Sequence, residues 1–506
     1  MIHDGSIGIG RGPFEARVAA AAGHPGLREG TVVALLADNG IDWLVAAAAV
    51  ERARAVLLPL PVFFTDAQCR HAMDAAGATL LLSDDAVRGS RLFRGPCSTL
   101  PGTALQGRQA ASADPLARHP ALPSGTVLIT FTSGSTGAPR GVCLGSEALS
   151  RVAQGVSEVA SALGIGRHLC LLPLAVLLEQ VAGTGAAMRA GATIFAPPLA
   201  AVGLSGSSGF DARRALDAMY RHAVHSVILL PQMLQALVDA AAAGASVPRT
   251  LRLAAVGGGR VPVALVERAR ALGLPACEGY GLSECGSVVA LALPSDAPGS
   301  GMRPLSHVRV GIRPLQSGPP REGGGIDSAS DDEEIVVEGR CFLGYLGEAA
   351  PRADGPLRTG DLGSIDAAGR LRITGRAGNL LITGFGRNVS PEWPEAELLA
   401  QPEIRQAAVF GEGRPWLCAV LVPAPAAGPG PDGSAALAAA VARVNATLPD
   451  YARIGGWVVA AAPFTPADGQ LTPNGRLRRE AILARHGAGL QALYECSQKE
   501  RQDALP

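Results

Sequence analysis

Lysine is nearly absent from this chain of 506 residues, in which Lys499 is the one example. Arginine therefore supplies almost all of the basic charge, and 44 basic side chains are balanced by 44 acidic ones. A formal net charge of zero excludes a global field that would draw the chain to nucleic acid or to an anionic membrane surface. Any anionic ligand must instead be held by local geometry.

Patterned cysteines and long apolar runs are also missing. The nine cysteines are odd in number and have no CxxC spacing, so we expect reduced thiols and no disulfide framework. The most apolar stretches, such as residues 32–50, are interrupted by polar residues such as Asp38 and Asp42. None reaches the roughly 18 apolar residues that a membrane span needs. The N-terminus lacks the continuous apolar core of a signal peptide. We therefore expect a cytoplasmic protein without a membrane span.

The first part of the chain alternates strand-like and helix-like segments. Apolar runs at residues 31–37, 55–61 and 78–85 are separated by segments of helical spacing at 41–55 and 65–77, the latter with Thr65 or Asp66 as its N-cap. This rhythm predicts a parallel sheet with helices on its faces.

The length of the chain indicates more than one domain. We predict an α/β fold with a large N-terminal domain (residues 1–377) of parallel or mixed sheets and helices. A small, mobile α+β domain (residues 378–506) is expected to follow it.

One loop is unusually poor in side chains. The apolar run "TVLIT" (residues 126–130) leads directly into "FTSGSTGAPRG" (residues 131–141). Small residues let backbone N–H groups approach an anion, hydroxyl groups add hydrogen bonds, and Arg140 supplies a cation. The alternative for a generic loop of this composition is an ordinary flexible surface loop. The candidate phosphate-binding residues are Thr132, Ser133, Gly134, Ser135, Thr136, Gly137 and Arg140.

The order T-S-G-S-T-G-x-P-R-G resembles the phosphate-binding signature of the AMP-forming adenylate ligases, the superfamily of acyl-CoA synthetases, nonribosomal-peptide adenylation domains and luciferases. Further patches resemble signatures of that family, and they occur in the family's order. They are "VGGGRVP" (256–262), "GYGLSE" (279–284), "RTGDLG" (358–363), "TGRAGNLLITGFGRNVSPEWPE" (374–395) and "FTPADGQLTPNGRLRRE" (464–480). The resemblance covers about residues 31–480 and is closest to the long-chain acyl-CoA synthetases.

The resemblance implies nucleotide-binding roles for residues outside the loop. Ser283 is expected to contact the α-phosphate, and Glu284 to hold Mg²⁺, for which a hard carboxylate oxygen is a suitable ligand. Asp361 is expected to bind the ribose hydroxyl groups, and Arg376 the ribose and a phosphate. The residues expected to line the adenine are Gly258, Gly259, Tyr280 and Gly281.

The chain departs from the family at a catalytic position, because Arg476 stands where the family carries the lysine that forms the adenylate. Arginine keeps the positive charge, but its guanidinium is bulkier and planar. The implied catalytic set is Arg476, Glu284 and Ser283, and two outcomes stay open: retained ligation, or an impaired half-reaction. Ala175 and Val176 lie where the family lines its acyl pocket; core packing is the alternative for this stretch.

The implied function is ATP-dependent activation of a carboxylic acid, expected to be a fatty acid, to an acyl-adenylate with release of pyrophosphate. Transfer to a thiol follows. Coenzyme A is the expected acceptor, and the phosphopantetheine of a carrier protein is the main alternative. The implied cofactors are ATP, Mg²⁺ and coenzyme A. A catalytically impaired binder of nucleotide and acyl group is the second class of function, motivated by Arg476.

Overall fold

The computed structural model describes residues 1–110, 122–132, 140–206, 209–314, 333–348, 355–383, 388–427, 430–472 and 475–502. The chain divides into two compact units. The first unit comprises Met1–Gly259, Glu267–Gly311 and Val336–Leu357, and the second comprises Arg260–Val266, Ile312–Ile335 and Arg358–Pro506. The domain boundary expected after residue 377 stays a prediction; by compactness, residues 358–377 belong to the second unit.

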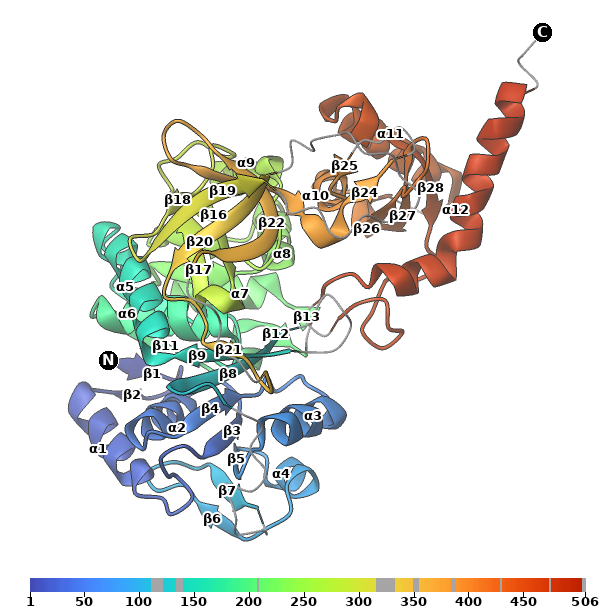
Figure 1. Cartoon of the computed structure of the whole chain (residues 1–506). Coiled ribbons are helices and arrows are strands. Elements are labelled where there is room, and N and C mark those ends of the chain that lie inside the picture. The colour runs from blue at the N-terminus through green and yellow to red at the C-terminus, as the bar shows by residue number, and fades with distance from the viewer. Residues whose placement is uncertain are drawn as a thin grey trace. The chain divides into compact units, whose positions relative to one another are not determined.

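An eight-stranded sheet forms one part of the first unit, in the order β21-β9-β8-β4-β3-β5-β7-β6 (Figure 1). Its central strands β8, β4, β3 and β5 run parallel, and antiparallel strands complete both edges. The strands are β3 (Val32–Leu36), β4 (Val56–Pro59), β5 (Leu80–Ser83), β6 (Cys97–Thr99), β7 (Gln106–Gln109), β8 (Thr126–Thr132), β9 (Arg140–Gly145) and β21 (Gly344–Tyr345).

The strand–helix rhythm predicted from the sequence is confirmed here. Helix α2 (Ile41–Arg52) packs on β3 and β4, and helix α3 (Asp66–Ala76) shares a core with alternate residues of the same strands. Thr65 caps α3, because its side chain accepts from the backbone N–H of Gln68 while the Gln68 side chain accepts from that of Thr65. Every residue of β3 is buried, as expected for a parallel strand covered on both faces.

A nine-stranded sheet forms the rest of the first unit's core, in the order β18-β17-β16-β15-β14-β10-β11-β1-β2. The six neighbouring strands β16, β15, β14, β10, β11 and β1 run parallel to one another. Antiparallel strands, β17 and β18 on one side and β2 on the other, complete the two edges. The strands are β1 (Ile2–His3), β2 (Gly8–Ile9), β10 (Arg167–Leu169), β11 (Thr193–Phe195), β14 (Ser226–Leu229), β15 (Leu253–Val256), β16 (Ala276–Leu282), β17 (Ser287–Leu291) and β18 (Arg303–Pro304).

The sheets carry further helices and short elements. The helices are α1 (Arg11–Ala22), α4 (Ala86–Leu92), α5 (Ser146–Ala162), the π-helix η1 (Leu178–Gly185), α6 (Ala186–Arg189), the 3₁₀ turn η2 (Leu199–Val202), α7 (Ala212–Arg221), α8 (Pro231–Ala242), α9 (Val263–Ala271) and the 3₁₀ turn η3 (Ser283–Cys285). A small hairpin pairs β12 (Leu204–Ser205) with β13 (Gly209–Phe210).

A four-stranded sheet has the order β19-β20-β22-β23. Its hairpin β22–β23 turns at Asp366–Gly369, where Gly369 adopts a φ of 74° and donates its N–H to the carbonyl of Asp366. The strands are β19 (Val308–Pro314), β20 (Glu333–Gly339), β22 (Leu357–Ile365) and β23 (Leu371–Arg376).

The C-terminal part of the second unit is an α+β layer. Strands β26, β27 and β28 form a sheet with one core on each face, and the first of these cores contains α11 residues such as Leu437 and Val441. Its elements are the 3₁₀ turn η4 (Ala377–Asn379), β24 (Leu381–Ile382), β25 (Asn388–Val389), α10 (Glu392–Leu399), β26 (Ile404–Phe410), β27 (Leu417–Pro423), the 3₁₀ turn η5 (Pro425–Ala427), α11 (Gly430–Thr447), the 3₁₀ turn η6 (Asp450–Ala452), β28 (Ile454–Val459) and α12 (Arg479–Gln502).

The fold class expected from the sequence is thus confirmed: a mixed α/β structure with a large N-terminal and a small C-terminal part. Among the residues placed by the structure, none of the helices combines the length and the apolar character of a membrane span.

Candidate active site

The predicted phosphate loop joins two antiparallel strands at the edge of the eight-stranded sheet. Thr132 ends β8 and faces Arg140 at the start of β9, and the Thr132 Oγ1 donates to the Arg140 carbonyl at 3.5 Å. The apolar strand expected before the loop is therefore present. The loop residues themselves, Ser133 to Gly137, lie outside the described residues.

Arg140 is oriented by two neighbours that the sequence did not indicate. Its guanidinium carbon lies 3.4 Å from the centre of the Tyr345 ring, and its Nη2 lies 2.7 Å from Glu348 Oε1. A guanidinium stacked on an aromatic face gains a cation–π attraction while its edge remains able to donate hydrogen bonds. The cation predicted for phosphate binding is thus held at the end of the loop.

Glu284, the predicted magnesium ligand, contacts the same tyrosine. It lies in η3, directly after β16, and its Oε1 accepts a hydrogen bond from the Tyr345 hydroxyl at 2.9 Å. Burial of the phenol is the larger cause, and the nearby Glu284 carboxylate the smaller, of a rise in the pKa of Tyr345 to about 12. The phenol therefore stays protonated at neutral pH and keeps donating to Glu284.

The residues predicted to line the adenine follow two neighbouring parallel strands. Gly258 and Gly259 come after β15, and Tyr280 and Gly281 lie in β16, which pairs with β15 up to Val256↔Glu278. Ligands of open α/β sheets bind at the carboxyl ends of such strands.

Glycine is required at two of these positions. A Cβ added to Gly281 would lie 1.8 Å from the Ser287 carbonyl oxygen, at a bulge between β16 and β17. Gly258 adopts a φ of 83°. Both glycines thus allow a backbone path that another residue would obstruct or strain.

In the second unit, the two predicted ribose-binding residues are cross-strand partners. Asp361 on β22 pairs in register with Arg376 on β23, and Asp361 Oδ1 lies 3.3 Å from Arg376 Nε. The Asp361 side chain is 14% exposed and that of Arg376 is 47% exposed. An acceptor and a donor thus lie side by side at the end of this hairpin, as binding of a hydroxyl-bearing sugar would require.

Arg476, also in the second unit, lies on a tight turn before α12. The carbonyl of Arg476 accepts from the Thr472 N–H at 2.7 Å, and the Arg476 N–H donates to Thr472 Oγ1 at 3.0 Å. The residue is exposed. Three residues later, Arg479 anchors this segment by a two-pronged contact with the buried Glu395, at 2.5 and 2.8 Å.

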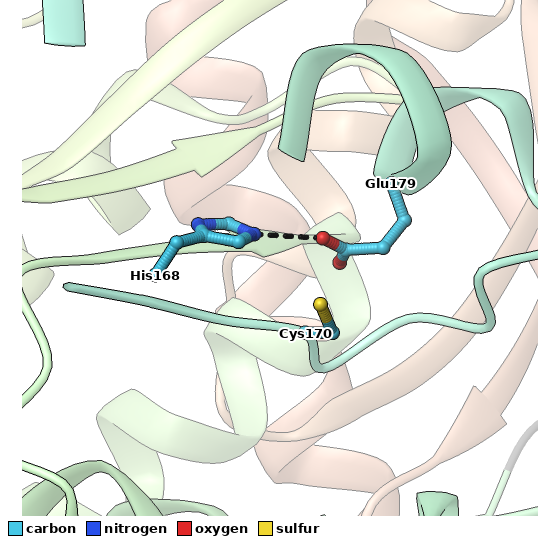
Figure 2. Close-up of side chains that lie close together, drawn as sticks. All are labelled: His168, Cys170 and Glu179. Atoms are coloured by element: carbon cyan, nitrogen blue, oxygen red, sulfur yellow. Dashed lines mark hydrogen bonds and ion pairs between the residues drawn. The ribbon is translucent and has the colours of Figure 1, made fainter. Parts of the chain in front are cut away.

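The first unit contains a buried polar cluster that was not predicted from the sequence (Figure 2). His168 from β10, Cys170 just after it and Glu179 from η1 place a ring nitrogen, the sulfur and a carboxylate oxygen within 4.8 Å of one another. Glu179 is 0% exposed and His168 is 3% exposed. His168 and Cys170 are two residues apart, which is the strand period, but Glu179 follows nine residues later on a different element, so no single sequence period marked the cluster.

Hydrogen bonds account for the polar atoms of this cluster. His168 Nε2 lies 2.8 Å from Glu179 Oε1, and its Nδ1 lies 2.9 Å from Ser226 Oγ. Glu179 Oε2 accepts from the Leu172 N–H at 3.2 Å. Burial and the Glu179 carboxylate raise the pKa of the Cys170 thiol well above its ordinary value. The donor types would suit zinc, but the close His–Glu bond indicates a hydrogen-bonded network.

The network holds one side of the segment predicted to form an acyl wall, and Asn39 holds the other. Asn39 Nδ2 donates to the Leu172 carbonyl at 2.9 Å, and Asn39 Oδ1 accepts from the Leu174 N–H at 2.7 Å. Within this clamped segment Ala175 is buried and Val176 is partly exposed. Its role as an acyl wall stays a prediction.

The structure therefore gathers the predicted residues into separate groups. One group in the first unit contains Arg140 and Glu284 around Tyr345, and another follows the carboxyl ends of β15 and β16. The second unit contains the pair Asp361–Arg376 and the turn that carries Arg476. Tyr345 was found from the structure alone. Gly344 and Tyr345 make up the whole of strand β21, and a strand of two residues has no recognisable sequence pattern.

Two family models match the chain. Residues 15–330 match the AMP-binding enzyme family, and residues 379–498 match the AMP-binding enzyme C-terminal domain.

Similar curated proteins include 2-succinylbenzoate–CoA ligase of Geobacillus kaustophilus (strain HTA426), 31% identical over 408 residues, which are 77% of this chain and 76% of the relative. A Mycobacterium tuberculosis ligase, 3-[(3aS,4S,7aS)-7a-methyl-1,5-dioxo-octahydro-1H-inden-4-yl]propanoyl:CoA ligase, is 30% identical and covers 78% of each chain. The long-chain-fatty-acid–CoA ligase FadD15 of Mycobacterium bovis is 31% identical over 48% of this chain and 42% of its own length.

A solved structure shows the same fold. The O-succinylbenzoate coenzyme A synthetase from Bacillus subtilis in complex with AMP superposes with a TM-score of 0.68 and 23% identity, covering 92% of this chain and 91% of its own. Together with the family models, these similarities identify the chain as a member of the AMP-binding enzyme family and, by class, an AMP-forming acid–thiol ligase.

Proposed function

We propose that the protein activates a carboxylic acid with an apolar body to its acyl-adenylate and then transfers the acyl group to coenzyme A. In the first step a carboxylate oxygen bonds to the α-phosphorus of ATP and pyrophosphate leaves. In the second step a thiol attacks the acyl carbon and AMP leaves. The observation that carries the proposal is the joint placement of Arg140 and Glu284 against Tyr345, beside the strand that enters the phosphate loop.

Glu284 fits a magnesium ion that is bound together with nucleotide phosphates. Mg²⁺ is usually held by one or two carboxylates plus substrate phosphates and waters. Glu284 provides such a carboxylate at partial exposure, with Oε1 oriented by the Tyr345 hydroxyl. When bound, the ion would neutralise charge on the phosphate oxygens. The task of this chain's own residues is to place the carboxylate.

The cationic residues would stabilise charge that develops on phosphate oxygens. Arg140 would donate to the phosphates next to the loop, and Ser283 would hold the α-phosphate by its hydroxyl group. Arg476 would hold the acid carboxylate against the α-phosphate. Such a reaction depends mainly on positioning and on fixed charges, because no proton needs to move in the first step.

The substrate class is narrowed by what the relatives share. Their names specify 2-succinylbenzoate, a propanoate on a bicyclic ring system, and long-chain fatty acids. Each is a carboxylic acid with a hydrocarbon ring or chain, although 2-succinylbenzoate carries a second carboxylate and a ketone, and the bicyclic acid carries two ketones. Ala175 and Val176 in the clamped segment would suit the hydrocarbon part of such an acid, because they add neither charge nor a polar group. We therefore propose aryl, ring-bearing and fatty acids as the substrate range.

The test is exchange of labelled pyrophosphate into ATP, measured with a panel of aryl-substituted, bicyclic and fatty acids. Exchange above background with one acid class supports adenylation and names the class. Thioester formation is then measured with coenzyme A and, separately, with a phosphopantetheine-bearing carrier protein. Absence of exchange with every acid, in protein that still binds ATP, would contradict the proposed ligation.

Arg476 favours a second candidate function, a binder of nucleotide and acyl group that does not complete adenylation. An arginine offers two donors in a plane where the family's lysine offers a compact charge. Tight ATP binding in calorimetry together with background exchange would select this alternative.

A further inference from the structure

Two cysteines of the first unit lie in sulfur–sulfur contact. Cys285 Sγ and Cys341 Sγ are 3.8 Å apart, although 56 residues separate them in the sequence. Cys285 is 1% exposed and Cys341 is 7% exposed. Since a disulfide bond measures about 2.05 Å, the two sulfurs need to approach by roughly 1.8 Å to be linked.

The backbone already holds the two cysteines together. The Phe342 N–H, which belongs to the peptide unit after Cys341, donates to the Glu284 carbonyl, which belongs to the unit before Cys285, at 2.6 Å. Cys285 ends a three-residue 3₁₀ turn and is followed by Gly286 with a φ of 75°, and Cys341 lies between β20 and β21. Neither cysteine lies inside a long helix or strand that would resist a small shift of the side chain.

We propose that Cys285 and Cys341 form a reversible intramolecular disulfide under peroxide oxidation. One thiol attacks the O–O bond of the peroxide, which gives a sulfenic acid and releases one water. The other thiol then attacks that sulfur, forms the S–S bond and releases a second water. Two thiols thus lose two electrons and two protons to one hydrogen peroxide. Exchange with a small dithiol restores both thiols.

The disulfide would act on the predicted metal ligand. Glu284 precedes Cys285 directly, and Tyr345, which donates to the Glu284 carboxylate, lies four residues after Cys341. A covalent bond between the two segments would fix Glu284 in its contact with Tyr345 and oppose any movement toward a nucleotide. This consequence rests on the proposed function; formation of the disulfide does not.

The modification is tested on the full chain by peptide mapping. The protein is treated with hydrogen peroxide, alkylated without reduction and digested with trypsin and chymotrypsin, because Cys277 shares a tryptic peptide with Cys285 and is separated from it by cleavage after Tyr280. We expect a linked peptide pair that contains Cys285 and Cys341 and disappears after dithiothreitol treatment. The exposed Cys97 reports that peroxide reached the protein. Oxidised Cys97 with Cys285 and Cys341 still unlinked, or linked to other cysteines, overturns the proposal.

Activity is the second readout. We expect pyrophosphate exchange of the wild type to fall at least several-fold when the linked peptide appears, and to return with dithiothreitol. Exchange by Cys341→Ser should not respond to peroxide, and Cys341→Ala serves if the serine variant does not fold. A linked peptide with unchanged exchange would refute the effect on Glu284. A linked peptide in protein that shows no exchange in either state would leave the disulfide standing and count against the proposed function.

Discussion

The Tyr345 hydroxyl donates a 2.9 Å hydrogen bond to Glu284 Oε1 while the Arg140 guanidinium lies over the face of the same ring. One aromatic side chain thus orients an anion at its edge and a cation on its face. Arg140 is predicted to bind a phosphate, and Glu284 is predicted to bind a metal ion. Glu348, whose Oε1 lies 2.7 Å from Arg140 Nη2, is the carboxylate that pairs with this cation.

Tyr345→Phe tests this arrangement. The variant keeps the ring under Arg140 but removes the hydrogen bond to Glu284. Outer-shell partners of metal ligands contribute about 10-fold or more to metal affinity, so we expect half-maximal exchange to need about 10-fold more Mg²⁺. The KM for the acid should stay unchanged. Tyr451→Phe, at an exposed tyrosine of the second unit, is the matched control; an unaltered Mg²⁺ dependence in Tyr345→Phe would argue against Glu284 as the ligand.

Arg476→Ala tests the predicted adenylation cation. Loss of one donor to a developing anion typically costs about 100-fold or more in rate, and we expect exchange to drop by that factor. Arg478→Ala removes an exposed arginine two residues away and should retain full exchange. Equal losses in both variants would point to disturbance of the turn and not to a catalytic role.

Arg476→Lys tests whether the native arginine is adapted to adenylation or has replaced the family's lysine without benefit to the reaction. If the site is fitted to a two-pronged guanidinium, a lysine should lower the exchange rate several-fold, because one of the two parallel hydrogen bonds is lost. We expect this result. Faster exchange by the lysine variant would instead mark the native arginine as a handicap to adenylation.

Gly183→Ala tests the buried network of Figure 2. A Cβ at Gly183 would lie 2.1 Å from Glu179 Oε1 and 2.9 Å from His168 Nε2. Overpacking of this kind costs about 1–3 kcal/mol, so we expect a clear loss in the free energy of unfolding measured by urea titration. Gly12→Ala, a helical position with nothing within 4 Å of an added Cβ, should change stability by less than about 1 kcal/mol. Stoichiometric zinc in the purified protein would contradict the network interpretation.

His24 predicts a pH dependence of stability. It accepts the Gly26 N–H at Nδ1 (3.1 Å) and contacts Ser98 Oγ through Nε2 (2.8 Å), which defines a neutral ring, and burial lowers its pKa from the ordinary 6.5. Because the unfolded chain takes up the proton first, this contribution is complete above about pH 6.5 and is lost as the pH falls toward the lower folded pKa. His24→Asn keeps an acceptor but cannot titrate.

The measurement is the melting temperature of wild type and variant between pH 7.5 and 5.5. We expect a smaller acid-induced fall in the His24→Asn variant. His71→Asn, at an exposed histidine, should follow the wild-type slope. Parallel slopes in all three proteins would show that His24 is not a source of acid sensitivity.

Features that depend on residues close together in the sequence are the ones that sequence patterns can predict. Thr65 caps its helix because its hydroxyl group and the Gln68 side chain form a reciprocal pair, and both lie within four residues. The Asp366–Gly369 turn likewise sets the register that brings Asp361 opposite Arg376. In each case the interacting residues are neighbours in the sequence or are connected by one short turn.

Long-range contacts were beyond such rules. Glu179 reaches His168 from a π-helix, whose period differs from the 3.6 residues that a sequence pattern would reveal. Tyr345 reaches Glu284 across 61 residues, and Cys341 reaches Cys285 across 56. These pairs depend on how separate elements pack together in the folded protein, and that information is not contained in either segment alone.

The first residues of the chain have a consequence for how the protein can be handled. Ile2–His3 form β1 alongside β11, and Gly8–Ile9 fold back on β1 as the final strand of the nine-stranded sheet. The Ile194 N–H donates to the Met1 carbonyl. Removal of residues 1–10 would leave β11 with an unsatisfied row of backbone donors and acceptors. Two molecules could then pair through these exposed strand edges. A shortened protein should therefore tend to aggregate, whatever its catalytic competence.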